Sequence, residues 1–275
     1  MLGKLMQYEI KSCGRIFFPF YIMGLIFSLI AALFINFDNY EHNFSVLYIV
    51  GIFAGLALFI AAIVLTILLI VQRFNKGLLE DEGYSMFTLP VSQKTLVLSK
   101  FLTSLLFIIL TSIVGMICIA LVSVMVGYKM SDVIDIGYGL KNMGSILSKN
   151  AGGILFYILS YIVNYSVFIL TIYLAITICH LPKLSKHKVL SGLVAMIVLN
   201  IIQSAIGGIF DYFMTSSRVE AIVNLDILFL NVDKLFGTIL SVGSYEIGIL
   251  ILNVVIALAL FFGTTTLLEK KLNLE

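Results

Sequence analysis

Six long runs of the chain contain no charged residue and no histidine, and they restrict its fold more than any other feature. Each run is 22 to 30 residues long, and together they cover residues 16–37, 43–72, 101–128, 150–179, 189–210 and 247–268. About 20 apolar residues are enough for a helix to cross the hydrocarbon core of a bilayer. Backbone groups in hydrocarbon must find their hydrogen-bond partners within the protein, and runs of this length do so as helices. The runs predict an all-α membrane protein with six spans, organised as one transmembrane domain over residues 1–275.

The overall composition excludes the soluble classes. The chain is 61% hydrophobic and 12% charged, whereas a soluble domain carries about 45–50% apolar and about 25% charged residues. The same numbers exclude a disordered chain and a disulfide-rich secreted scaffold. Cys13 and Cys179 fall near the predicted cytoplasmic side and Cys118 falls within the third span, so the cysteines indicate no disulfide framework.

The lysines and arginines are distributed unequally between the two sides of the predicted membrane. Twelve of the 17 fall on the side that holds both termini, and five fall on the other side. Cytoplasmic connections carry the excess of basic residues, so both termini are predicted to be cytoplasmic. The first run is too long for the apolar core of a cleavable signal peptide, and we expect it to be retained as the first span.

Residues 2–15 have the pattern of an amphipathic helix at the membrane interface. At 100° per residue, one arc holds the apolar side chains and the opposite arc holds the cations. The apolar arc contains Leu2, Leu5, Met6, Ile10 and Cys13, and the cationic arc contains Lys4, Lys11 and Arg15. Such a helix places its apolar face in the headgroup boundary and its cations near anionic lipid. Glu9 falls inside the apolar arc, where it is either a rim residue that snorkels to water or a contact to a protein partner.

The connection between the second and third spans combines acidic and apolar residues. Three acidic residues are followed by a glycine, an apolar cluster and Pro90. The acidic residues are Glu80, Asp81 and Glu82, the glycine is Gly83, and the apolar cluster is Tyr84, Met86, Phe87 and Leu89. Such a cluster needs burial, either against its own spans or against another protein. Ser92 is placed to cap the N-terminus of the helix that becomes the third span.

The segment 211–246 on the outer side is mostly apolar but is interrupted by charges. A seventh span through it would bury Asp226, Asp233 and Lys234, each at a cost of about 2.5–3.5 kcal/mol at the centre of a helix. A re-entrant or interfacial pair of short helices before the last span fits better.

Few residues inside the spans have catalytic or ligand-binding chemistry. Cys179, His180 and His187 invite comparison with a metal site, but Pro182 interrupts the helix between them and the chain has no second cluster of this kind. We therefore interpret them as residues of a cytoplasmic rim. The sequence contains no His-Glu-x-x-His, no Gly-x-Ser-x-Gly and no phosphate-binding loop. We therefore expect that the chain is not an enzyme and itself binds no cofactor, metal or nucleic acid.

Four polar side chains inside the spans have two possible roles. Asn164, Asn200, Gln203 and Asn253 either form interhelical hydrogen bonds or line a transport path. The spans carry no acidic residue or histidine for a proton relay, which argues against an ion-coupled secondary transporter. Ser204 and Gly208 have the spacing that allows two membrane helices to approach closely.

Two segments resemble ABC-2 type transporter permeases, the membrane subunits of bacterial ABC exporters. The first is the stretch from Glu82 to Ser92 with its Pro-Val-Ser turn, followed by Ser99 and Lys100 where the family often has Gly-Lys. The second is the start of the chain, from Leu5 to Lys11 and on to Gly14 and Arg15, which resembles the family's N-terminal amphipathic helix. The expected order of spans is similar over the whole chain.

The resemblance implies a function and a set of partners. Two permeases, identical or related, would form the path, and separate ATPase subunits would bind ATP and magnesium. A short coupling helix between spans two and three would enter each ATPase, with residues 80–82 making charged contacts and Met86 and Phe87 anchoring it. The expected location is the bacterial cell membrane, and the apolar spans suggest a hydrophobic or amphipathic cargo such as a peptide or drug. The alternative is a non-catalytic scaffold or sensor that docks a cytoplasmic partner through residues 73–95.

Overall fold

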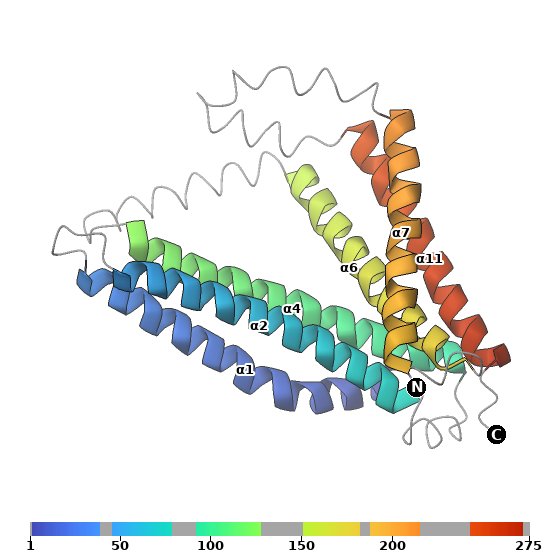
Figure 1. Ribbon diagram of the computed structural model, residues 1–275, viewed down its shortest axis with the longest axis horizontal. Coiled ribbons are helices and arrows are strands. Elements are labelled where there is room, and N and C mark those ends of the chain that lie inside the picture. Colours follow the sequence, from blue (N-terminus) through green and yellow to red (C-terminus); the bar gives the residue numbers. More distant parts are fainter. Residues whose placement is uncertain are drawn as a thin grey trace. The chain divides into compact units, whose positions relative to one another are not determined.

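The computed structural model describes six segments of the chain, and their regular structure is helical. The segments are residues 2–38, 46–78, 92–127, 151–181, 188–214 and 243–271. The helices are α1 (Leu2–Asp38), α2 (Val46–Leu78), α4 (Gln93–Gly127), α6 (Ala151–Cys179), α7 (Lys188–Met214) and α11 (Ser244–Lys271), as Figure 1 shows. Each contains most of one uncharged run, and all six are long and apolar enough to cross a membrane. For the described residues, the predicted all-α architecture is confirmed, with six helices that could cross a membrane by length and composition. The expected coupling helix and the outer helical pair fall outside the described residues.

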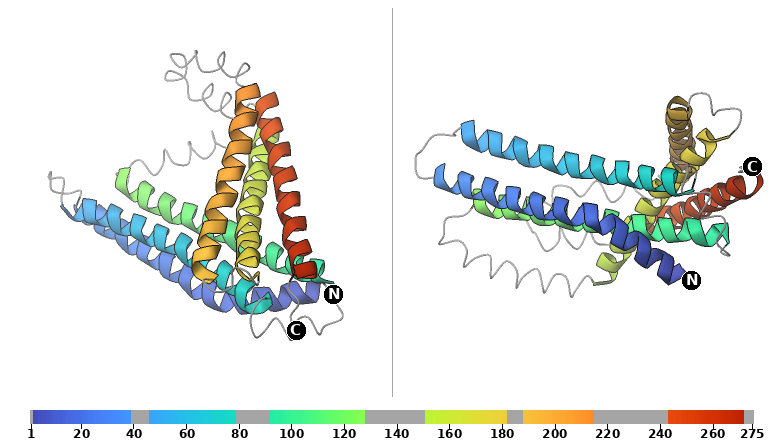
Figure 2. Two further views of the ribbon diagram at one scale, coloured as in Figure 1. Left: turned by 45° about the vertical axis from the view of Figure 1, so that its right-hand side comes forward. Right: turned by 90° about the horizontal axis from the view of Figure 1, so that it is seen from below.

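The amphipathic segment at the start of the chain continues without a break into the first membrane helix. Residues 2–15 form the first part of α1, and Pro19 lies within the same helix. Proline removes one backbone hydrogen bond and its ring crowds the preceding turn, and α1 is visibly bent in Figure 2. The predicted apolar arc is buried or half-buried, whereas Lys4, Lys11 and Arg15 are exposed. The apolar arc therefore has protein neighbours, while its location at the membrane interface stays a prediction.

The chain divides into two compact units, Met1–Gly137 and Tyr138–Glu275. In the first unit, α1 packs along α4 (Figure 2), and α2 contacts both of them. A cluster of buried side chains holds α1 against α4: Cys13, Phe17, Tyr21 and Phe107. The rings of Phe17 and Phe107 stack with their centroids 4.5 Å apart, an offset arrangement that adds to the energy of apolar burial.

Further along α1, three hydroxyl groups join all three helices of the first unit. The Tyr21 hydroxyl lies 2.7 Å from Thr111 Oγ1, and Thr111 Oγ1 lies 3.1 Å from Thr66 Oγ1. Tyr21 also donates to the carbonyl oxygen of Phe107 at 3.2 Å. Hydrogen bonds between membrane helices contribute modestly, about 0.6 kcal/mol on average, but this set fixes the relative rotation of α1, α2 and α4.

In the second unit, α6 packs against both α7 and α11. Glycines mark close approaches: Gly192 lies beside Cys179, Gly263 beside Leu174 and Gly248 beside Phe210. A side chain at Gly207 or Gly208 would meet no atom of the described residues within 4 Å. The close helix approach predicted at Ser204 and Gly208 is therefore not made among the described residues of this chain. The physical reason is that α7 meets α11 through Phe210, which lies on another face of the helix.

Candidate functional site

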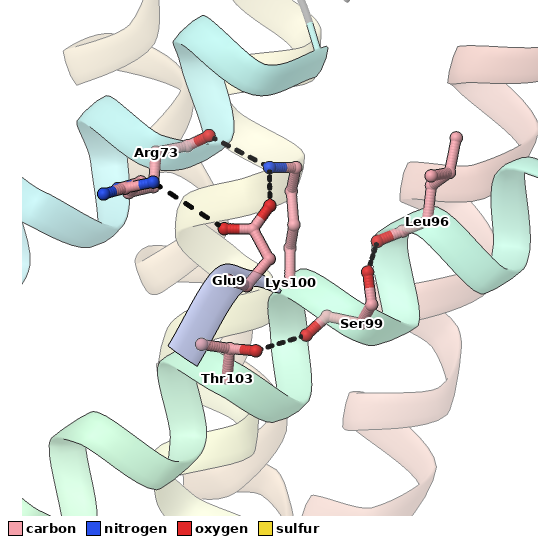
Figure 3. A network of polar contacts seen from close by, with 6 residues as sticks. All are labelled: Glu9, Arg73, Leu96, Ser99, Lys100 and Thr103. Carbon is pink, nitrogen blue, oxygen red and sulfur yellow. Dashed lines mark hydrogen bonds and ion pairs between the residues drawn. The ribbon is translucent and has the colours of Figure 1, made fainter. Parts of the chain in front are cut away.

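One acidic and two basic side chains meet where α1, α2 and α4 come together, and we call Glu9, Arg73 and Lys100 the charge cluster. Lys100 Nζ donates to Glu9 Oε1 at 2.7 Å, and Arg73 Nη1 lies 3.9 Å from Glu9 Oε2. Lys100 Nζ also lies 3.5 Å from the backbone oxygen of Arg73. Figure 3 shows the Glu9 carboxylate facing both cations. Each of the three helices thus contributes one charge.

The charge cluster is largely shielded from solvent. Glu9 and Lys100 are 6% and 5% exposed, and Phe74, Leu96 and Val97, which lie near Arg73 and Lys100 in the sequence, are also buried. Burying an unpaired charge is very costly, so buried charges are found paired and hydrogen-bonded. The 2.7 Å contact supplies the pairing for Lys100, and Arg73 balances the second carboxylate oxygen from a more exposed position, 30% accessible.

The two cations flank the connection between α2 and α4. Arg73 lies shortly before the end of α2 at Leu78, and Lys100 lies about two turns into α4, which begins at Gln93. The start of α4 is fixed by Ser92, whose Oγ accepts from Thr95 N at 3.4 Å and lies 2.8 Å from Thr95 Oγ1. The predicted N-cap is confirmed. The charge cluster therefore links the two helices on either side of residues 79–91 to the N-terminal part of α1.

The structure revises the interpretation of Glu9. The residue does not snorkel to water, because its side chain is buried, and the contacts that it makes are to its own chain. Its place in the apolar arc has a physical reason: that arc faces α4, and Lys100 supplies the opposite charge there. The sequence held a signal for this contact, since Glu9 is the sole acidic residue among the first 37 and Arg73 and Lys100 were assigned to the same side of the membrane.

The predicted docking residues themselves lie outside the described residues. They are Glu80, Asp81, Glu82, Gly83, Tyr84, Met86 and Phe87. The structure describes the helices on either side of them, and with these helices the charge cluster. The predicted docking of an ATPase by these residues stays a prediction.

Three of the four predicted polar side chains make hydrogen bonds between helices of the second unit. Asn253 Nδ2 donates to Asn164 Oδ1 at 3.1 Å, joining α11 to α6. Gln203 Nε2 donates to Thr171 Oγ1 at 2.8 Å, joining α7 to α6. Asn200 instead donates to the carbonyl oxygen of Met196 in its own helix at 2.8 Å. The second unit therefore has two amide contacts around α6.

The ends of the helices in the second unit carry two further polar contacts. At the C-terminal end of α7, Asp211 Oδ1 accepts from the Tyr245 hydroxyl of α11 at 2.5 Å. At the end of α6, Cys179 Sγ lies 3.3 Å from His180 Nδ1, which is also 3.0 Å from the Ile176 carbonyl oxygen. Among the described residues, no group of three or more His, Cys, Asp or Glu side chains is placed to hold a metal ion. His187, the third residue of the predicted cluster, is outside them.

No family model, curated protein or solved structure matches this chain. Inference about function therefore rests on the contacts within the chain. The Glu9 carboxylate of the charge cluster faces two cations, Arg73 and Lys100. Through these contacts the charge cluster links α1, α2 and α4.

Proposed function

We propose that this chain is the permease subunit of an ATP-driven ABC exporter, working with a second permease and with a dimer of separate ATPase subunits. The observation that carries the proposal is the charge cluster, because it joins the two helices that flank residues 79–91 to α1. A force applied to the connection by a cytoplasmic partner reaches three membrane helices at once. A motor that docks outside the membrane needs a rigid contact of this kind, because its motion must be transmitted to the membrane helices.

The proposed coupling follows from the rigidity of the first unit. The charge cluster, the stacked rings of Phe17 and Phe107 and the hydroxyl set around Thr111 lie at successive levels along the same three helices. Packed helices shift as bodies because close-packed interiors are bistable and do not deform continuously. Closure of the ATPase dimer on ATP and magnesium would therefore move α1, α2 and α4 together.

The remaining features of the proposal concern the parts around the spans. Residues 2–15 lie at the cytoplasmic interface of the bacterial cell membrane, and both termini are cytoplasmic. A short coupling helix within residues 79–91 enters the ATPase, where acidic residues 80–82 make charged contacts and Met86 and Phe87 anchor the helix. The outer segment before α11 forms re-entrant or interfacial helices. The support for these features is the charge distribution and the resemblance to ABC-2 permeases.

The proposed cargo is hydrophobic or amphipathic, such as a peptide or drug. The membrane helices offer mostly aliphatic and aromatic surface, and their polar groups are amides and hydroxyls. Asn164 and Asn253 form an exposed pair in the second unit that is suited to a cargo with amide groups. An ionic cargo would require charged groups along its path.

A direct test is to purify the tagged chain from its native membranes and identify the chains that accompany it. We expect an ATPase with a nucleotide-binding loop and Mg-ATP hydrolysis in the purified complex. The Glu82→Ala/Phe87→Ala double variant should lose most of this ATPase, because anchors of this kind contribute about 2 kcal/mol or more to an interface. The matched control is Lys76→Ala, an exposed residue at the end of α2.

Two results would contradict the proposal. One is a complex without any ATPase but with another cytoplasmic protein that the double variant releases, which identifies a scaffold or sensor. The other is a double variant that retains the ATPase and its activity at the level of the control, which removes the connection as the docking site.

A further inference from the structure

One face of α1 is exposed along its whole described length and changes its chemistry midway. At 100° per residue, eight side chains fall within an arc of about 80°. They are Lys4, Tyr8, Lys11, Arg15, Phe18, Ile22, Ile26 and Leu29, and all eight are exposed. The first four are basic or hydroxylated and the last four are apolar, so the change occurs between Arg15 and Phe18.

The opposite face of the same helix packs against the rest of the first unit. Glu9 pairs with Lys100, and Cys13, Phe17 and Tyr21 are buried against Phe107. The one acidic residue of this part of α1 is therefore neutralised inside the unit. The exposed face keeps three cations and no acid, and its local charge is +3 by this count.

We infer that this face binds an anionic phospholipid, with the phosphate held by Lys11 and Arg15 and one acyl chain lying along Phe18 and Ile22. Two observations favour a lipid over a soluble anion. The cations continue directly into an apolar stripe of membrane-spanning character, and Tyr8, which is 66% exposed, is of the type that anchors at the headgroup level.

The position of Phe18 strengthens the assignment of the acyl chain. The residue is 57% exposed, and its Cε2 atom lies 3.0 Å from the place that a Cβ of Gly14 would occupy. The ring thus leans toward the N-terminus, over a residue without a side chain, and lies beside Arg15 in the register of the helix. A cation and an aromatic ring side by side match the junction of a lipid headgroup with its chains.

The test uses the absence of tryptophan from the chain. Phe18→Trp creates a single fluorescent reporter at the apolar side of the junction. The full-length variant is reconstituted in phosphatidylcholine vesicles that contain a minority of phosphatidylglycerol. Either lipid is supplied with brominated acyl chains, which quench tryptophan on contact. We expect brominated phosphatidylglycerol to quench the reporter more than its bulk share predicts, by about five-fold in relative affinity for each cation that contacts it.

Charge variants of the reporter protein decide whether the exposed face of α1 causes the preference for phosphatidylglycerol. Lys11→Gln/Arg15→Gln should abolish the preference for phosphatidylglycerol. Lys76→Gln/Lys94→Gln removes the same charge from two exposed positions at the ends of α2 and α4 and should leave the preference intact. Both double variants change exposed side chains only. Circular dichroism of each variant checks that the helices are retained.

Each other outcome overturns the inference. Equal quenching by the two brominated lipids in the parent reporter means that the face contacts bulk lipid without selection. An equal loss of preference in both pairs of variants means that net charge attracts the lipid and that no site exists on α1. The result is independent of the exporter proposal, because no ATPase or cargo takes part in the measurement.

Discussion

Replacing Lys100 by methionine is expected to lower the free energy of unfolding by about 3 kcal/mol. The change leaves the Glu9 carboxylate buried without its 2.7 Å partner, and breaking a buried ion pair from one side costs about 3–5 kcal/mol. We expect the lower end of this range because Arg73 remains 3.9 Å from the carboxylate. In thermal unfolding of the purified protein in a mild detergent, this corresponds to a decrease in midpoint of about 6–12 °C.

Two further variants separate the loss of the ion pair from a general effect of the substitution. Lys94→Met changes an exposed lysine of the same helix and should shift the midpoint by no more than about 2 °C, since surface substitutions usually stay within about ±0.5 kcal/mol. Glu9→Leu/Lys100→Met replaces the pair by apolar side chains and should recover most of the stability, as such replacements are often neutral. Two results would show that the ion pair does not stabilise the first unit. One is an unfolding midpoint of Lys100→Met equal to that of the unchanged protein, and the other is a midpoint of the double variant below that of Lys100→Met.

The same double variant carries a functional expectation. If the double variant keeps the first unit folded, the helix packing is retained. The ion pair between Glu9 of α1 and Lys100 of α4 is lost. Under the exporter proposal, such a variant retains its ATPase partner and transports cargo more slowly. The charge cluster would then act as a joint, and its contribution to transport would be separable from its contribution to stability.

The sequence predicted the six membrane helices because the requirement of the bilayer is local. A run of about 20 apolar residues is readable without knowing its neighbours, and the N-cap at Ser92 is readable for the same reason, since a cap involves residues three apart. Residues 2–15 were also expected to be helical, but the sequence did not indicate that Pro19 would be accommodated within one helix running to Asp38.

The charge cluster and the helix contacts of the second unit depend on distant residues, and the sequence alone does not pair them. Glu9 meets Lys100 across 91 positions, and Asn253 meets Asn164 across 89. The sequence predicted that the four amides form hydrogen bonds between helices or line a transport path. It did not indicate that Asn200 would donate to a carbonyl oxygen of its own helix. The small-residue spacing at Ser204 and Gly208 permits a close approach but does not identify the neighbour, and no described residue of this chain lies within 4 Å of a side chain placed at Gly208.

Gly248 is one of the glycines at a close approach in the second unit, and a side chain there should disrupt the packing. A Cβ at this position would lie 2.6 Å from Cζ of Phe210, closer than nonbonded atoms approach. Gly248→Leu displaces the Phe210 ring, whose centroid lies 6.2 Å from that of Tyr245. The Tyr245 hydroxyl donates to Asp211, so this displacement disturbs the contact between the ends of α7 and α11. Overpacking typically costs about 1–3 kcal/mol. We expect about 2 kcal/mol, measured as a decrease of about 4–8 °C in the unfolding midpoint.

A compensating change makes this prediction specific to the one contact. Phe210→Ala removes the ring, so Gly248→Leu/Phe210→Ala should be more stable than either single variant, because the leucine fills the space that the ring leaves. Gly207→Leu, where a side chain meets nothing within 4 Å, should leave the midpoint unchanged or raise it slightly, since leucine favours the helix over glycine. Failure of Phe210→Ala to rescue Gly248→Leu would mean that α7 and α11 do not meet through this pair, and that the polar contact between Tyr245 and Asp211 alone aligns their ends.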